Sequence, residues 1–167
     1  MIRLTTILLF ANNSLQLHFS RTTHPSILLS GSTDGYINVF DTLQPNEDDA
    51  LQYTINNQSA IHHALGLPSH DFSTIFALST DETLTIHPGY REKDALTGEE
   101  PEDERKEVAL GDLRALLGCD YVVDLRVDVG RVVVVAGRNR YVAPVLKILR
   151  WSSLKQRIDI NTSTSYH

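Results

Sequence analysis

Four residues in the middle of the sequence could together ligate a metal ion: His62, His63, His70 and Asp71. Zinc is held by three or four nitrogen, sulfur or carboxylate ligands that converge on one point. Adjacent side chains of a strand point to opposite faces, so we expect at most one of His62 and His63 to join His70 and Asp71. A metal-dependent hydrolase is therefore an alternative function, and the main prediction is that these residues bind no metal.

The single cysteine, Cys119, could act as a nucleophile if a cationic or basic neighbour lowered the pKa of its thiol. Its neighbour in the sequence is instead an acid, Asp120. The sequence also contains no Gly-x-Ser-x-Gly motif, phosphate-binding loop or dinucleotide fingerprint. We therefore predict a buried structural thiol, no catalytic residues, no cofactor and a protein that is not an enzyme.

Charge limits the partners that the chain could bind. Its 167 residues carry a formal net charge of -6, whereas a nucleic-acid backbone needs a basic face. An acidic run over residues 99–104 could dock a basic protein, but we interpret it as part of a charged linker over residues 90–106. A basic cluster near Trp151 could bind nucleic acid, but we interpret it as an amphipathic strand; its members are Lys147, Arg150, Lys155 and Arg157.

The elements that position these groups are predicted by a hydrophobic period of two. Apolar and polar residues alternate over residues 15–19, 36–39 and 83–86, which is the pattern of antiparallel strands. Four consecutive valines over residues 132–135 predict a strand that is buried on both faces. Leucines at helical spacing predict a short helix over residues 110–117. The chain is therefore predicted to be all-β and made of short hairpins.

Two of these hairpins repeat. Asp34 and Asp81 lie 47 residues apart, and aligning them superposes SGSTDGYINVF on ALSTDETLTIH. In the first turn Asp34 can accept hydrogen bonds from nearby backbone N–H groups, and Gly35 can adopt a positive φ. In the second copy Asp81 is expected to shape the turn in the same way, but Glu82 replaces the glycine, which predicts a different or strained turn. A less distinct third copy aligns residues 135–139 with residues 29–33, and Leu146 and Ile148 follow it.

A repeat period in the forties with a Ser/Thr-Asp-Gly turn is typical of a β-propeller blade. We predict an incomplete β-propeller of about three to four blades over residues 1–158. Its blade-like units cover about residues 12–42, 51–88 and 107–151, and residues 159–167 form a flexible tail.

The segment LLSGSTDGYINVFDT resembles the third and fourth strands of a tryptophan–aspartate (WD) repeat, with Phe40-Asp41 at the place of the Trp-Asp pair. The order of EDDALQYTINNQSAIHHALGL, FALSTDETLTI and GDLRALLGCDYVVDL resembles the WD repeat-containing protein 89 family of fungi, over about residues 12–137. This resemblance implies a seven-bladed propeller and a role in protein interaction. Since about three and a half periods fit in the chain, we expect a truncated propeller or one that associates with itself through open strand edges.

Propellers bind partners through the loops at one end of their blades. By position, the candidate partner-binding residues are Arg21, His24, Glu47 and Asp48. The predicted function is a non-catalytic WD-repeat scaffold for protein or peptide partners, and a second alternative is a truncated propeller with no autonomous function. One cysteine rules out an internal disulfide framework, which favours an intracellular location, in the cytoplasm or the nucleus. No stretch approaches the roughly 20 apolar residues that span a bilayer, so no membrane partner is expected.

Overall fold

The computed structural model describes residues 14–19, 26–67, 72–90, 106–128, 131–139, 145–152 and 157–162. Several sequence predictions lie outside these residues: the charged linker except for its two ends, the tail beyond residue 162, and Arg21, His24, His70 and Asp71. Within the described ranges the chain is dominated by antiparallel strands, as the period of two predicts.

The described strands form three sheets, each built from four antiparallel strands that are consecutive in the sequence. The first sheet contains β1 (Ser14–Phe19), β2 (Ile27–Ser32), β3 (Tyr36–Asp41) and β4 (Leu51–Asn56). The second sheet contains β5 (Ile61–Gly66), β6 (Thr74–Ser79), β7 (Thr83–Pro88) and β8 (Val108–Asp112). The third sheet contains β9 (Tyr121–Asp128), β10 (Arg131–Gly137), β11 (Val145–Ser152) and β12 (Arg157–Thr162).

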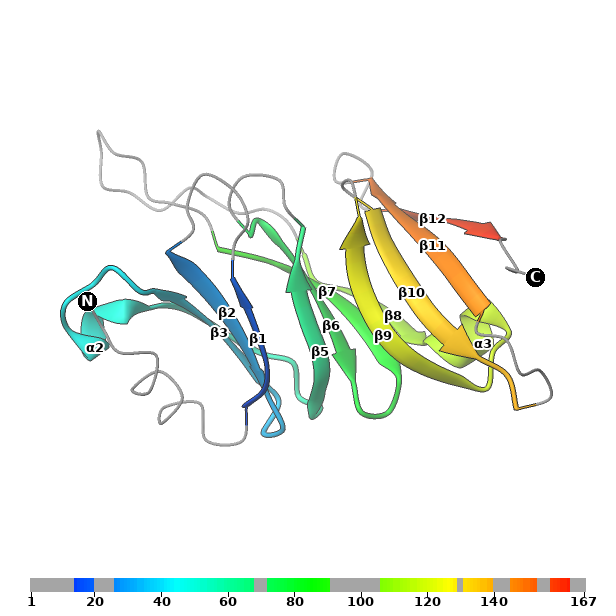
Figure 1. Ribbon diagram of the computed structural model, residues 1–167, viewed down its shortest axis with the longest axis horizontal. Helices are drawn as coiled ribbons and strands as arrows, with labels where there is room; N and C mark the ends of the chain where they lie inside the picture. The colour runs from blue at the N-terminus through cyan, green and yellow to red at the C-terminus, as the bar shows by residue number, and fades with distance from the viewer. Residues whose placement is uncertain are drawn as a thin grey trace.

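The three sheets stand side by side in a row, in the order of the sequence, and they do not close into a ring (Figure 1). The strands β1, β5 and β9 lie at corresponding edges of their sheets, and β5 contacts both of the others. Two helices are short, α2 (Glu47–Ala50) and α3 (Leu113–Leu117), and no helix in the described ranges is long and apolar enough to cross a membrane. The prediction of an all-β, incomplete propeller is confirmed.

The repeat of 47 residues is visible in the backbone pairing. Leu28 pairs with Phe40 in the first sheet, and Ile75, 47 residues after Leu28, pairs with His87 in the second. A β-bulge interrupts the pairing of the first two strands at the same place in both sheets, beside Ser32 and beside Ser79. The two hairpins therefore have the same register, as their sequence similarity predicts.

The third copy is shifted from the predicted alignment. Its bulge lies between Val135 and Ala136, where the first sheet has Gly31 and Ser32. Val133 therefore takes the place of Leu29, whereas the sequence comparison assigned this place to Val135. The connection from β10 to β11 is also longer than its counterparts in the other two sheets. The third copy therefore has no Ser/Thr-Asp turn on which the sequences could be aligned.

The sheets divide the chain differently from the predicted blade units. The strand β4 belongs to the first sheet rather than the second unit, and β8 belongs to the second sheet rather than the third. The strand β12 reaches Thr162, where a flexible tail was predicted from residue 159. The fourth strands were assigned to the wrong units because they lack a clear alternation; in β4 only Ile55 is buried.

Two further predictions need correction. The helix α3 is shorter than predicted, because Leu110 belongs to β8 and the Asp112 side chain caps the helix by accepting a hydrogen bond from the Arg114 backbone N–H at 2.8 Å. The valine run is not buried on both faces. Val132 and Val134 are fully buried, whereas Val133 and Val135 are half-buried.

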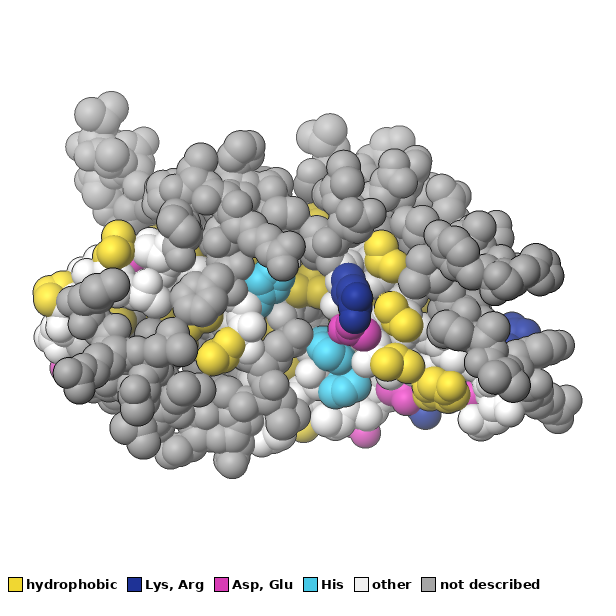
Figure 2. All heavy atoms as spheres, viewed as in Figure 1, with side chains coloured by type: hydrophobic (Ala, Val, Ile, Leu, Met, Phe, Trp, Pro, Cys, Tyr) yellow, Lys and Arg dark blue, Asp and Glu magenta, His cyan; other side chains and the backbone are white. Residues whose placement is uncertain are grey.

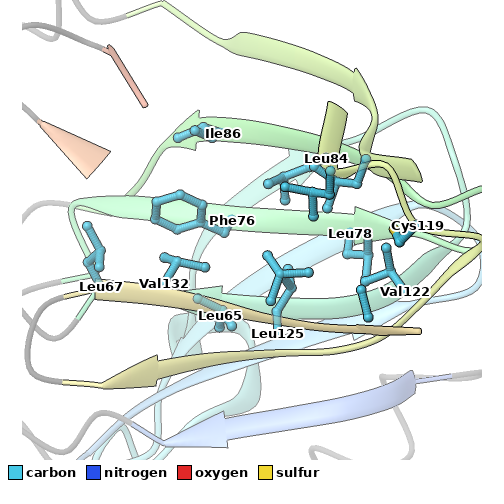
Figure 3. Close-up of a cluster of buried hydrophobic side chains, with 14 residues drawn as sticks. Leu65, Leu67, Phe76, Leu78, Leu84, Ile86, Cys119, Val122, Leu125 and Val132 are labelled. Carbon is cyan, nitrogen blue, oxygen red and sulfur yellow. The ribbon is translucent and has the colours of Figure 1, made fainter. Parts of the chain in front are cut away.

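The hydrophobic core lies between neighbouring sheets. The middle strand β6 contributes to both interfaces, since Ile75 and Ala77 face the first sheet and Phe76 and Leu78 face the third. Figure 3 shows the cluster between the second and third sheets, which includes Leu65, Leu67, Phe76, Leu78, Leu84, Ile86, Cys119, Val122, Leu125 and Val132. Burial of both faces of β6 ties the three sheets into one packed unit.

Candidate interaction surfaces

The turn between β2 and β3 has the geometry that its residue types suggest. Gly35 has φ = 89°, a value that a side chain would resist. The Oδ1 atom of Asp34 accepts a hydrogen bond from the Tyr36 backbone N–H at 3.0 Å, and the Gly35 N–H donates to the Ser32 carbonyl at 3.1 Å. These bonds are local, so we propose that Asp34 and Gly35 shape the hairpin rather than meet a ligand.

The corresponding turn between β6 and β7 has a second role that the sequence did not suggest. Glu82 occupies the glycine position with φ = 63°, and its N–H donates to the Ser79 carbonyl at 3.0 Å. Its Oε2 atom accepts a hydrogen bond from the Val122 N–H of β9 at 2.8 Å. Glu82 thus stays in a conformation that favours glycine while it links the second sheet to the third. Asp81, which was expected to shape this turn, is exposed beside it, and its role there stays a proposal.

Two substitutions of Glu82 distinguish the cost of its positive φ from the loss of its hydrogen bond with Val122. Glu82→Ala keeps the unfavourable φ and leaves the Val122 N–H without its carboxylate, so we expect it to lower the free energy of unfolding by about 1–3 kcal/mol. Glu82→Gly loses the same hydrogen bond but tolerates the positive φ, so its loss should be smaller. Urea unfolding of the three proteins measures the order, and an alanine variant at least as stable as the glycine variant would contradict this account.

The surface along β5 and β9 carries a chain of polar side chains that crosses from the second sheet to the third. His63 donates a hydrogen bond from Nε2 to the Val123 carbonyl at 3.2 Å, and its Nδ1 atom lies 3.5 Å from Oδ1 of Asp124. The other carboxylate oxygen of Asp124 accepts a hydrogen bond from Nε of Arg126 at 2.6 Å. Figure 2 shows histidine, acidic and basic side chains together in the middle of this face, beside hydrophobic side chains over β9 and β10.

The bulge in β5 changes the expected directions of the two adjacent histidines. An uninterrupted strand would point His62 and His63 to opposite faces, but the pairing shifts between Ile61 and His63. The two rings consequently lie next to each other, with centroids 4.3 Å apart and planes tilted by 56°. The prediction that they face opposite sides is therefore wrong.

A second histidine links the first two sheets. His87 is almost fully buried, and its Nε2 atom donates a hydrogen bond to Oδ1 of Asn57, just after β4, at 2.8 Å. Its Nδ1 atom lies 3.4 Å from Oε2 of Glu107. Burial lowers the pKa of His87 below 6.5, although Glu107 opposes this shift. The pKa of His63 is also lowered, mainly by burial and to a smaller extent by the charge of His62. Asp124 and the Val123 carbonyl oppose this shift.

These two pKa shifts predict acid destabilisation. An unfolded histidine takes up its proton near pH 6.5, whereas folded His63 and His87 take theirs up at lower pH. Below about pH 6.5 the unfolded state therefore binds more protons, and the free energy of unfolding falls until the lower folded pKa values are passed. We expect a lower urea midpoint near pH 5.5 than near pH 7.5.

The control for this prediction is a double variant, His63→Gln with His87→Gln. Glutamine can donate from Nε2 to the same acceptors and does not titrate. The variant should lose part of the pH dependence, measured as the difference in urea midpoint between the two pH values. An unchanged difference would show that other groups cause it.

The described residues do not form the arrangement that a metal site or an activated cysteine would need. No three His, Cys, Asp or Glu side chains come together there as a metal site, while His70 and Asp71 lie outside the described ranges. Cys119 is buried in the cluster between the second and third sheets. Burial raises the pKa of its thiol, and nearby Glu82 raises it further, so the thiolate form is disfavoured.

Of the predicted partner-binding residues, Glu47 and Asp48 lie in the described part of the chain. Glu47 begins α2, after the first sheet's third strand, and Asp48 is exposed in the same helix. Arg21 and His24 lie outside the described residues.

The third sheet has a partly exposed face that sequence reasoning missed. Asp124 pairs with Val135, Arg126 with Val133 and Tyr121 with Gly137 across β9 and β10, so all of these residues share one face. We call Tyr121, Asp124, Arg126, Val133 and Val135 the third-sheet face. Its reverse face is buried: Val122, Leu125 and Val134 pack toward the second sheet. Because four valines follow one another, the sequence pattern does not distinguish the buried face of β10 from the partly exposed one.

Comparison with known proteins gives the same family as the repeat. The chain is 45% identical over 105 residues to the uncharacterized WD repeat-containing protein YNL035C of Saccharomyces cerevisiae, a match that covers 61% of the chain and 24% of that protein. It is 31% identical over 109 residues to the uncharacterized WD repeat-containing protein C63.06 of Schizosaccharomyces pombe, which covers 60% and 31%. The chain is similar to WD repeat-containing proteins. Scanning against family models gave no match.

The three sheets therefore correspond to WD-repeat blades, and the predicted resemblance to this family is confirmed. The matches to the chain span about a quarter to a third of the length of these two relatives. The closer resemblance to the WD repeat-containing protein 89 family stays a prediction.

Proposed function

We propose that this WD-repeat chain is a non-catalytic scaffold that binds protein or peptide partners. Similarity to WD repeat-containing proteins supports a role in protein interaction, and the buried, proton-retaining Cys119 provides no activated nucleophile. An intracellular location is part of the proposal and rests on cysteine usage alone.

The observation that carries the proposal is the composition of the third-sheet face. Tyrosine and arginine are enriched at the energetic centres of protein interfaces, and this face presents Tyr121, 41% exposed, and Arg126, whose side chain is 73% exposed. Both lie on a strand whose other side is packed into the core, so they are held in place before a partner arrives. Val123, at the bulge, adds a second exposed apolar side chain beside them.

The predicted loop site is a second surface for the same function. It comprises Arg21, His24, Glu47 and Asp48, and the exposure of Asp48 in α2 is compatible with it. Self-association through open strand edges also belongs to this proposal, since each described sheet has two edge strands.

Affinity capture with three proteins tests the proposal: the wild-type chain, a variant with alanine at the four loop positions, and Val135→Asp. Captured proteins are compared quantitatively by mass spectrometry, with circular dichroism as the check on folding. We expect Val135→Asp to lose specific partners, and the loop variant to lose any that use the loops. If both folded variants retain every partner at full strength, neither surface is a partner-binding site.

Elemental analysis of the purified protein tests the rival hydrolase. The scaffold proposal predicts no stoichiometric zinc, iron or manganese. A stoichiometric metal that disappears in a His63→Ala variant would favour the hydrolase instead.

A further inference from the structure

His87 occupies a position that the repeat gives to an apolar side chain. Its equivalent in the first sheet, 47 residues earlier in the sequence, is Phe40. Both residues are almost fully buried, but the ring of His87 reaches Asn57, which follows the first sheet. A buried imidazole is costly unless its two nitrogens find partners, so the contacts of these nitrogens indicate what His87 does at this junction.

The contacts of Asn57 fix which nitrogen of neutral His87 carries the hydrogen. The Nδ2 atom of Asn57 donates to the Ser59 carbonyl at 3.3 Å, and its Oδ1 atom faces His87. An amide oxygen only accepts, so Nε2 of His87 is the donor in the 2.8 Å bond between them. A neutral imidazole has one N–H group, and Nδ1 of His87 therefore carries a lone pair and no hydrogen.

The Nδ1 atom of His87 faces a second acceptor. Oε2 of Glu107 lies 3.4 Å from it. An ionised carboxylate has no hydrogen to donate, so a lone pair and an anionic oxygen face each other while His87 is neutral. One proton at Nδ1 would convert this pair into a charge-assisted hydrogen bond.

Glu107 stands where the pairing between β7 and β8 ends. The last pair in this register is Ile86 with Val108, and one further step would place Glu107 opposite His87. The side chain of Glu107 is 56% exposed, whereas that of His87 is 4% exposed. Since β8 is an edge strand of its sheet, its first residues pair with β7 alone. A bond between the two side chains would therefore act on the least supported part of β8.

We propose that His87 and Glu107 form a proton-operated clasp at the beginning of β8. A proton taken up from solvent at Nδ1 draws the Glu107 carboxylate onto the ring and holds β8 against β7. Loss of this proton releases the carboxylate to water, while the bond from Nε2 to Asn57 persists in both states. This inference goes beyond the proposed scaffold function and does not depend on it.

The surroundings of His87 set the pH range of the clasp. Among the described residues, Glu107 faces it from β8, uncharged Asn57 from the link after β4, and Ile75 from β6. Burial lowers the pKa of His87 below 6.5, and the charge of Glu107 opposes this shift. The clasp thus closes below about pH 6.5. Acid still destabilises the whole fold, because an unfolded histidine binds the proton more tightly, and the clasp limits this loss.

Nitrogen-resolved NMR of the His87 ring, between about pH 4.5 and 7.5, tests the clasp. In the wild-type chain the neutral ring should carry its hydrogen on Nε2 and take up the second at Nδ1. Glu107→Gln should lower the pH midpoint of this titration by about 0.5 or more, because no carboxylate then favours the charged ring. Asp48→Asn is the control, since it removes an exposed charge in α2, and it should leave the midpoint unchanged.

Hydrogen exchange, corrected for the pH dependence of the intrinsic rate, tests the effect on β8. The strand β4 is the comparison, because it is the edge strand of the first sheet and begins opposite Phe40, which does not titrate. Relative to β4, the wild-type β8 should exchange at least about 2-fold more slowly when His87 is charged than when it is neutral. In Glu107→Gln this ratio should not change with pH.

Three results would overturn the clasp. They are a neutral ring with its hydrogen on Nδ1, a titration midpoint that is the same in wild type and Glu107→Gln, and a β8-to-β4 exchange ratio that ignores the charge of His87. Glu107→Gln should fold, because its amide can donate to the bare Nδ1, and its urea midpoint near pH 7.5 should be at least that of wild type. None of these measurements involves a partner, so affinity capture tests the scaffold proposal separately.

Discussion

Phe76→Ala is expected to lower the free energy of unfolding by about 3–5 kcal/mol. Among the described residues Phe76 is the largest fully buried side chain, and it belongs to the cluster between the second and third sheets. Its removal deletes apolar contacts and leaves a cavity, because β6 is held on both faces and cannot move inward. Domains have a total stability of about 5–15 kcal/mol, so much of the variant should be unfolded in mild urea.

Tyr36→Ala is the control for this prediction. It also truncates a large aromatic side chain in a strand, but Tyr36 is 42% exposed, so little apolar surface returns to water. We expect a loss of at most about 1 kcal/mol, measured by urea unfolding under the same conditions. Equal losses in the two variants would show that the second and third sheets do not share a packed core.

Gly89→Ala has the second largest expected effect, a loss of about 3 kcal/mol. A Cβ atom on Gly89 would overlap the backbone carbonyl oxygen of Phe72, and a backbone atom cannot rotate away as a side chain can. The Gly89 N–H donates to the Ser73 carbonyl at 2.9 Å, so the clash would also disrupt the pairing that ends the β6–β7 hairpin. The equivalent position in the first sheet holds Thr42, which shows that Phe72, rather than the repeat itself, requires the glycine.

Gly111→Ala provides the matched comparison. Gly111 has φ = 72°, and an added Cβ would meet nothing within 4 Å. Only conformational strain opposes the change, at about 1 kcal/mol. Chemical denaturation of the two alanine variants measures the difference. A loss at Gly89 no greater than that at Gly111 would contradict the close approach of Phe72.

The sequence was sufficient to predict the class of the fold and two of its hairpins. Alternation at Ile37 and Val39, repeated at Leu84 and Ile86, identified the repeat, because these residues face a core in both copies. Local turn chemistry supported the same result, since Gly35 needs its positive φ. Such features depend on residues near one another in the chain, which is why they can be recognised without a structure.

The features that the sequence did not reveal depend on neighbours distant in the chain. Fourth strands such as β4 were assigned to the wrong unit, because β4 buries only Ile55 and therefore has little hydrophobic pattern. The bulge that brings His62 and His63 together carries no residue signature here. The bond from Val122 to Glu82 joins residues 40 positions apart, so neither residue type alone could suggest it.

The central claim is that three WD-type sheets form one packed unit that can serve as a scaffold, rather than a fragment with no structure of its own. Hydrogen exchange of the purified chain, resolved by peptide, tests it most directly. The amides of the second strands β2, β6 and β10 should be the slowest to exchange, and they should open with similar free energies, because β6 packs on both neighbours. Exchange in β10 or β2 as fast as in an unfolded chain, while β6 stays protected, would contradict it.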